Sequence, residues 1–142
     1  MIDVIKVMLD KDKDAIMPKR AHKNDAGLDF FAPRDIYING GCFVGVDTGV
    51  HVLIPEGYVG LMKSKSGYLF SRGMETDGTV DADYTGSIGV WLLNNSSQPI
   101  AFKRGEKIAQ MVILPCICPE PVEVDSFPET ERGSHGFGST GK

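Results

Sequence analysis

The chain has 142 residues, of which 42% are hydrophobic and 24% charged, and this composition is ordinary for one globular domain. A net charge of −4 and a pI of about 5.3 speak against a nucleic-acid polymer or a membrane surface as partner, so an anionic ligand must find positive charge locally. We expect no membrane span, because no stretch of about 18 apolar residues occurs. We also expect no secretory signal, because the N-terminus becomes charged too early.

The cysteines are Cys42, Cys116 and Cys118. They form no zinc pattern, because the Cys-x-Cys pair has neither a second pair nor a nearby histidine. We interpret them as small apolar residues in a reducing compartment. The expected location is therefore cytoplasmic, or nuclear if the source is eukaryotic or viral.

The first half of the chain is typical of short strands separated by turns. Strands are expected over residues 2–9, 26–31, 36–38, 42–46, 48–54 and 58–62. Asn39-Gly40-Gly41 is a hairpin-turn signal between two of them. The basic stretch 18–25 is expected to be a loop.

The second half contains the one stretch that predicts a helix, residues 66–73, with Ser66 as N-cap and Gly73 as the stop. Further strands are expected over 88–92, 100–103 and 107–114. Short strands with turn signals roughly every 8–12 residues predict an all-β fold. We expect a jelly roll or distorted β-barrel with one short helix and a flexible C-terminal arm. The expected division is a β domain over 1–125 and an arm over 126–142.

Residues 78–90, GTVDADYTGSIGV, combine two acids, a tyrosine and three glycines between two expected strands. A hairpin here would hold the carboxylate of Asp81 beside a concave site, with the ring of Tyr84 close by. The glycines at 78, 86 and 89 permit close approach of a ligand or another backbone. Taken alone, a surface turn with solvated acids explains the stretch equally well.

Residues 132–141, RGSHGFGSTG, have the composition of a phosphate cradle. Glycines free the backbone N–H groups to face an anion, Ser139 and Thr140 add hydroxyl donors, and Arg132 adds a bidentate guanidinium. Phe137 offers a ring face on which a nucleobase can stack. The alternative is a solvated, flexible terminus.

This arm resembles the last motif of the trimeric dUTPase family, Arg-Gly, two variable residues, then Gly-Phe-Gly-Ser-Thr-Gly. Four further motifs resemble the family's in order and spacing: AGLDF over 26–30, KSG over 65–67, GTVDADYTG over 78–86 and GEKIAQM over 105–111. Together the matches run from residue 26 to residue 141.

The resemblance implies a jelly-roll subunit in a homotrimer with active sites at the subunit interfaces. It implies hydrolysis of dUTP to dUMP and pyrophosphate, which keeps uracil out of DNA and supplies dUMP for dTMP synthesis. Mg²⁺ is expected as cofactor, held by substrate phosphates and water without a direct protein ligand. No nucleic-acid polymer and no membrane is expected as partner.

By the same resemblance, Asp81 is the catalytic base that activates a water for attack on the α-phosphate. Tyr84 packs beneath the deoxyribose and excludes a 2′-hydroxyl, and the backbone around Gly78 and Val80 reads uracil. Asp29 is expected to hold the basic residue of the second motif across a boundary, or to be a structural buried acid. The other expected substrate-binding residues are Lys65, Ser66, Gly67 and Gln110 for the α- and β-phosphates, Arg132, Gly138, Ser139 and Thr140 for the β/γ end, and Phe137 for the base.

Two residues depart from the family pattern. Lys65 stands where arginine is usual, which removes the planar fork, and Lys63 on the same strand face is expected to compensate. Glu75 has no expected role beyond that of a solvated acid.

Two rival readings are weaker. A dCTP deaminase needs a glutamate near the position of Trp91, and none lies between residues 87 and 106. A non-catalytic nucleotide sensor would be favoured by loss of Asp81 or of the arm, and both are present. Binding of a regulatory partner survives only as an added role.

Overall fold

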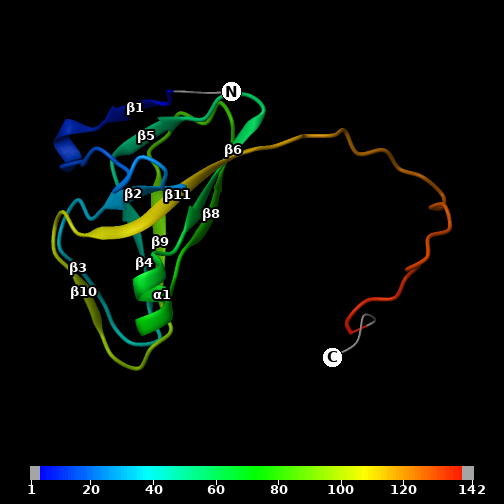
Figure 1. Ribbon diagram of the computed structural model, residues 1–142. Coiled ribbons are helices and arrows are strands. Elements are labelled where there is room, and N and C mark those ends of the chain that lie inside the picture. The colour runs from blue at the N-terminus through cyan, green and yellow to red at the C-terminus, as the bar shows by residue number, and fades with distance from the viewer. Residues whose placement is uncertain (1–3, 139–142) are drawn as a thin grey trace.

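The computed structural model describes residues 4–138 and shows an all-β fold with one short α-helix (Figure 1), which confirms the expected fold class. The strands are β1 (Lys6–Leu9), β2 (Gly27–Phe31), β3 (Ile36–Ile38), β4 (Phe43–Asp47), β5 (Val50–Leu53), β6 (Tyr58–Lys63), β7 (Met74–Glu75), β8 (Asp77–Val80), β9 (Gly89–Asn94), β10 (Ile100–Phe102) and β11 (Lys107–Pro115). The helix α1 spans Ser66–Arg72, and a 3-10 turn, η1, spans Lys11–Lys13.

The strands form four sheets, with the orders β2-β11-β6-β8, β4-β9-β7, β1-β5 and β10-β3. All pairs are antiparallel. Over the described residues the sheets do not join into a closed barrel. The more specific jelly-roll or barrel arrangement therefore stays a prediction.

One hydrophobic core joins the sheets. Strand β9 alternates buried and exposed positions, as expected for a strand with one face on a core, and β2 and β11 contribute the fully buried Phe30 and Met111. Val80, the last residue of the edge strand β8, is also buried. The core thus anchors the point at which the chain enters residues 81–88.

Two expected hairpins are wrong. Strands β3 and β4, on either side of Asn39-Gly40-Gly41, pair with β10 and β9 instead of with each other. Strands β8 and β9 lie in different sheets, so residues 81–88 form a crossing loop. Turn residues determine only where the chain reverses, whereas packing of apolar faces determines the pairing partner. The buried side chain of Asn94 helps to hold the first reversal, since its Nδ2 donates to the carbonyls of Ile38 and Asn39 at 3.1 and 3.2 Å.

The helix α1 starts one residue earlier than expected. Its N-cap is Lys65, whose side chain makes no capping hydrogen bond, so the prediction that Ser66 is the N-cap is wrong. Lys65 keeps an extended backbone while its ammonium group reaches Asp29. Gly73 ends the helix in the left-handed conformation at φ 61°, as expected. No helix within residues 4–138 is long and apolar enough to cross a membrane.

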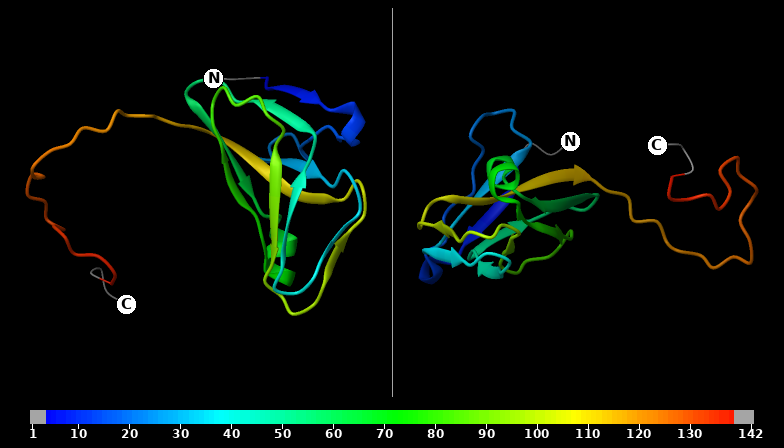
Figure 2. Two further views of the ribbon diagram at one scale, coloured as in Figure 1. Left: turned by 180° about the vertical axis from the view of Figure 1, so that it is seen from behind. Right: turned by 90° about the horizontal axis from the view of Figure 1, so that it is seen from below.

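Beyond β11 the chain leaves the sheets. The N–H of Cys116 donates to the carbonyl of Gly57 at 2.8 Å, and residues 117–138 are exposed and carry no helix or strand. Figures 1 and 2 show this segment curving away from the body. The division at residue 125 stays a prediction.

Candidate active site

An open hollow of about 290 Å³ lies where β8 passes into the crossing loop. It is lined by Thr79, Val80, Asp81, Tyr84, Ser87, Ile88 and Gly89. The structure therefore brings together three residues that the sequence singled out, Val80, Asp81 and Tyr84, and Gly78 precedes them on β8.

Asp81 follows the buried Val80 directly, so the edge of the core fixes where its side chain starts. The carboxylate is exposed and forms no ion pair within residues 4–138. The turn behind it is closed by the N–H of Tyr84, which donates to the Asp81 carbonyl at 3.4 Å, and by Asp83 at φ 65°. The Asp81 carboxylate is thus available to accept a proton from a ligand or a water.

The ring of Tyr84 is held on both sides. Its hydroxyl donates to the carbonyl of Ser87 at 3.1 Å, and a Cβ added to Gly86 would lie 2.2 Å from that hydroxyl oxygen. Glycine at position 86 therefore leaves room for the tyrosine ring where it lies, and a larger residue would make this half-exposed ring shift. A Cβ at Gly78 would meet Met62 only at 3.6 Å, an ordinary contact, so within one chain only Gly86 confirms the close-approach argument at this loop.

A second group of expected residues surrounds Asp29, whose side chain is buried. Its Oδ1 lies 2.6 Å from Lys65 Nζ and its Oδ2 lies 2.8 Å from Lys107 Nζ. Burial raises the pKa of Asp29, but the hydrogen bonds from Lys107 and Lys65 together bring the pKa below its ordinary value. Asp29 is thus a buried acid and also holds Lys65, so both expected roles apply to it. It does so within one chain, so the expected contact across a boundary is wrong.

Gln110 supports the loop that carries the second motif. Its Nε2 donates to the carbonyl of Ser64 at 2.9 Å, next to Lys65. A Cβ on Gly27 would lie 1.9 Å from the Gln110 side-chain oxygen, so the glycine of the first motif makes room for the glutamine of the fourth. Ser66 and Gly67 follow on the exposed start of α1.

The structure also places Lys63, which was expected to compensate for Lys65, and Glu75, which had no expected role beyond that of a solvated acid. Lys63 pairs with Asp77 at 2.5 Å, so it is engaged away from Lys65. Glu75 is exposed on β7 opposite Leu93.

Residues 64–65 connect β6 to α1 and are called the Lys65 loop here. The hollow and the Lys65 loop lie at opposite ends of strands β6 and β8. In the antiparallel pair β6–β8, Gly60 lies opposite Val80 and Lys63 opposite Asp77. Three strand residues, at roughly 3.3 Å each, put about 10 Å between these two levels. A single chain therefore does not bring Asp81 and the Lys65 loop together.

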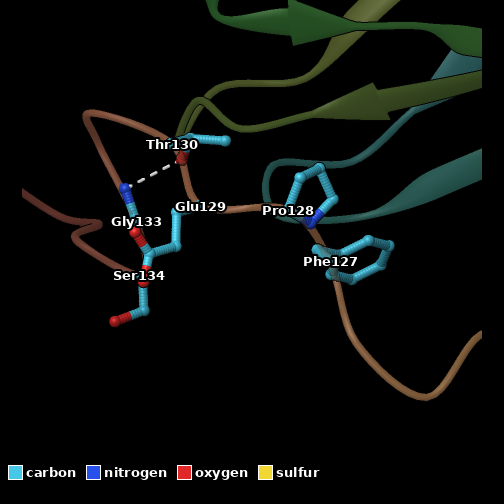
Figure 3. A pocket seen from close by; sticks show the side chains of 6 residues that line it. All are labelled: Phe127, Pro128, Glu129, Thr130, Gly133 and Ser134. Carbon is cyan, nitrogen blue, oxygen red and sulfur yellow. Dashed lines mark hydrogen bonds between the residues drawn. The ribbon is translucent and has the colours of Figure 1, made fainter.

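The arm does not reach the hollow either. Arg132, Phe137 and Gly138 are exposed, and Arg132 Nε donates to the carbonyl of His135 at 2.9 Å. Ser139 and Thr140 lie outside the described residues. A separate hollow of about 550 Å³ (Figure 3) is formed by the arm's own Phe127, Pro128, Glu129, Thr130, Gly133 and Ser134. It contains none of the expected binding residues.

Sequence reasoning missed two contributors. Lys107 is the second cation on Asp29, and its place at the start of β11 opposite Phe31 was not visible without the pairing of β11 with β2. His51, whose Nδ1 lies 2.7 Å from the carbonyl oxygen of Thr85, contacts the crossing loop from β5. The only indication in the sequence that His51 has a special role is its place between two valines in an expected strand.

An exposed carboxylate in an open hollow, without an ion pair among residues 4–138, is compatible with nucleotide hydrolysis when a lysine-bearing loop and a glycine-rich arm are also present. The family model described as dUTPase matches residues 13–141. The chain belongs to the dUTPase family, the enzymes that hydrolyse dUTP to dUMP. This assignment also removes the deaminase reading.

Individual relatives agree. A deoxyuridine 5′-triphosphate nucleotidohydrolase of Clostridium tetani is 40% identical over 141 residues, which are 97% of each chain. The dUTPase of Staphylococcus bacteriophage 80alpha, solved with dUpNHpp, gives a TM-score of 0.90 at 32% identity and covers 99% of this chain and 100% of its own. A variant dUTPase from phage phi11 of S. aureus, which coordinates a structural Mg(II) ion, gives a TM-score of 0.79 at 30% identity over 88% of this chain and 99% of its own.

Proposed function

We propose that Asp81 acts as the base in the hydrolysis of dUTP to dUMP and pyrophosphate. The carrying observation is the exposed carboxylate of Asp81, without an ion pair among residues 4–138, in the same hollow as Tyr84. The water oxygen bonds to the α-phosphorus while the bond from that phosphorus to the oxygen bridging to the β-phosphate breaks. Asp81 takes the water proton, and pyrophosphate leaves.

Selection of the nucleoside is assigned to the hollow. The fixed ring of Tyr84 would lie beneath the deoxyribose and leave no room for a 2′-hydroxyl. Strand β8 is the last strand of its sheet, so its outer backbone edge has no strand partner among the described residues. That edge, from Gly78 to Val80, would read uracil through backbone hydrogen bonds.

The phosphates are assigned to the remaining motif residues. Lys65, Ser66, Gly67 and Gln110 would hold the α- and β-phosphates, and Arg132, Gly138, Ser139 and Thr140 the β/γ end. Phe137 would stack over the base.

We propose that these parts meet in a homotrimer, with each active site at a subunit interface. Two observations support this arrangement: the Lys65 loop lies at the far end of β6 and β8 from Asp81, and the arm extends away from its own body. A neighbouring subunit would supply the Lys65 loop or the arm to each hollow. The jelly-roll topology is proposed on the same family basis.

Mg²⁺ is proposed as a cofactor that arrives with the substrate. Within residues 4–138 no group of three or more His, Cys, Asp or Glu side chains is placed to hold a metal ion. We propose that triphosphate oxygens and water would coordinate the ion. When bound, Mg²⁺ would neutralise part of the phosphate charge.

The activity would keep uracil out of DNA and supply dUMP for dTMP synthesis. We therefore place the protein where DNA precursors are made, in the cytoplasm or, in a eukaryotic or viral setting, the nucleus.

The test is pyrophosphate release from dUTP, dCTP, dTTP and UTP with Mg²⁺, for the wild type and Asp81→Asn. We expect rapid release from dUTP alone and a loss of at least about 10³-fold in kcat in the variant, because the amide cannot take the proton. Absence of release from every nucleotide, with dUTP still bound, would replace the enzymatic proposal by a nucleotide-sensing one.

A further inference from the structure

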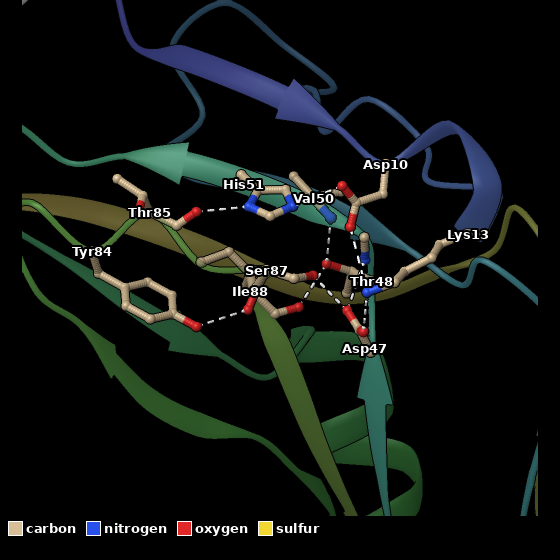
Figure 4. A network of polar contacts seen from close by, with 11 residues as sticks. Asp10, Lys13, Asp47, Thr48, Val50, His51, Tyr84, Thr85, Ser87 and Ile88 are labelled. Atoms are coloured by element: carbon tan, nitrogen blue, oxygen red, sulfur yellow. Dashed lines mark hydrogen bonds and ion pairs between the residues drawn. The ribbon is translucent and has the colours of Figure 1, made fainter.

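The crossing loop is tied to the N-terminal part of the chain through one histidine (Figure 4). His51, on β5, lies with Nδ1 2.7 Å from the carbonyl oxygen of Thr85 and with Nε2 3.0 Å from the carboxylate of Asp10. Its side chain is 17% exposed, so the two contacts take up most of its polar surface. Thr85 is the residue after Tyr84, so the contact reaches the hollow directly.

Both partners of His51 are hydrogen-bond acceptors. A carbonyl and a carboxylate are satisfied together only when both ring nitrogens carry a proton, that is, by the imidazolium form. The hydrogen bond to Thr85 and then that to Asp10 raise the pKa of His51, while burial and the charge of Lys13 oppose them. Two other charged groups belong to these surroundings. Lys6 lines the same hollow of about 300 Å³ as His51, and Asp47 on β4 pairs with Lys13.

A second tie runs parallel to the first. Asp47 accepts hydrogen bonds from the hydroxyl of Ser87 at 2.5 Å and from the N–H of Gly49 at 3.1 Å. Lys13 bridges the Asp47 and Asp10 carboxylates at 2.8 and 3.4 Å. The carbonyl of Ser87 in turn accepts the Tyr84 hydroxyl, so this tie also ends at the hollow.

The contacts of His51 and Asp47 matter because the crossing loop belongs neither to the sheet of β8 nor to the sheet of β9. Backbone hydrogen bonds fix its two ends, from the N–H of Asp83 to Ile54 O at 3.3 Å and from the N–H of Ile88 to Val50 O at 2.7 Å. Between them the loop is held by side chains, with His51 on Thr85 and Asp47 on Ser87. A segment that forms no backbone hydrogen bonds with a neighbouring strand keeps a single conformation only if side-chain contacts of this kind stabilise it.

We propose that His51 is a positioning residue for dUTP hydrolysis: as an imidazolium between Asp10 and the carbonyl of Thr85, it holds the crossing loop in the geometry that presents Asp81 and Tyr84 to the nucleoside. The proposal rests on the proposed function of this hollow. It predicts that substrate affinity depends on pH through a group that does not touch the substrate. Deprotonation of His51 leaves one ring nitrogen with a lone pair against an acceptor, either the Asp10 carboxylate or the Thr85 carbonyl, and so loosens the tie.

The kinetic experiment compares His51→Leu with His22→Leu, which removes an exposed loop histidine outside this network. For His51→Leu we expect KM for dUTP to rise about tenfold, because a charge-assisted hydrogen bond is lost. We expect kcat to fall as well, because the same loop presents Asp81. In the wild type KM should rise with pH as His51 loses its proton. That rise should be absent in His51→Leu and displaced to lower pH in Asp10→Asn, which changes little volume. Equal KM values and equal pH profiles for the wild type and His51→Leu would overturn the proposal.

A second readout does not need turnover. NMR titration of the imidazole resonances should give His51 a pKa above the ordinary value for histidine, and that pKa should be lower in Asp10→Asn. Calorimetry should show about tenfold weaker binding of dUpNHpp by His51→Leu. A His51 pKa at or below the ordinary value for histidine would contradict the geometry. If the wild type bound dUpNHpp in the His51-dependent manner but hydrolysed nothing, the proposed function would fail, and the role of His51 in holding the loop for nucleotide binding would stand.

Discussion

Asp29 and Asp81 are carboxylates in two regions that are built in opposite ways. Asp29 is 3% exposed and carries a lysine on each oxygen, whereas Asp81 is exposed and has no ion pair among residues 4–138. The first arrangement neutralises the charge that burial would otherwise make costly. The second leaves the carboxylate able to accept a proton. Asp29 thus stabilises the fold, whereas Asp81 is the carboxylate that the proposed mechanism uses as its base.

Beyond the change at Asp81 itself, the largest effect on turnover without an effect on stability is expected from the arm. Removal of residues 132–142 should lower kcat/KM for dUTP by about 100-fold or more, because the proposed contacts to the β/γ-phosphates and the base are lost. The midpoint of thermal unfolding should stay within about 1 °C, because the described part of this segment is fully exposed. Arg132→Lys is the matched control, keeping the charge without the bidentate fork. Unchanged turnover after the deletion would show that the phosphate and base contacts are misplaced.

The reverse pattern is expected at Asp29. Asp29→Asn should lower the free energy of unfolding by about 3 kcal/mol, because two lysines lose their buried counter-charge. Urea denaturation at fixed protein concentration measures this. Asp81→Asn is the control and should leave the stability unchanged.

The sign of the pH dependence at Asp29 follows from its lowered pKa. The stabilisation is present above the ordinary value of 3.8, which applies to the unfolded chain, and is lost as pH falls through the lower pKa of the folded state. The difference in stability between the wild type and Asp29→Asn should therefore shrink at acid pH, where a protonated carboxyl resembles the amide. A difference that stays constant down to about pH 2 would show that charge pairing is not its source.

The same contrast explains what the sequence could reveal. Asp81, Tyr84 and Gly86 lie within six residues, so their grouping follows from local chain geometry and was predicted. The contact between Lys107 and Asp29 joins residues 78 positions apart, and the contact between His51 and Asp10 joins residues 41 positions apart. Both contacts depend on strand pairing. The two wrong hairpins have the same cause, because turn residues do not specify the sheet to which the next strand belongs.

The smallest effect is expected at Lys65, where the family usually has arginine. Lys65 already reaches the buried carboxylate at 2.6 Å and is only 25% exposed, so an arginine there would keep the pair and add a second planar donor. Lys65→Arg should therefore leave kcat/KM for dUTP unchanged or raise it by about twofold. Lys63→Arg, the same change on the lysine paired with Asp77, is the matched control and should have no effect. A large loss of turnover in Lys65→Arg alone would mean that the compact ammonium is itself required, and that Asp29 selects lysine at this position instead of merely tolerating it.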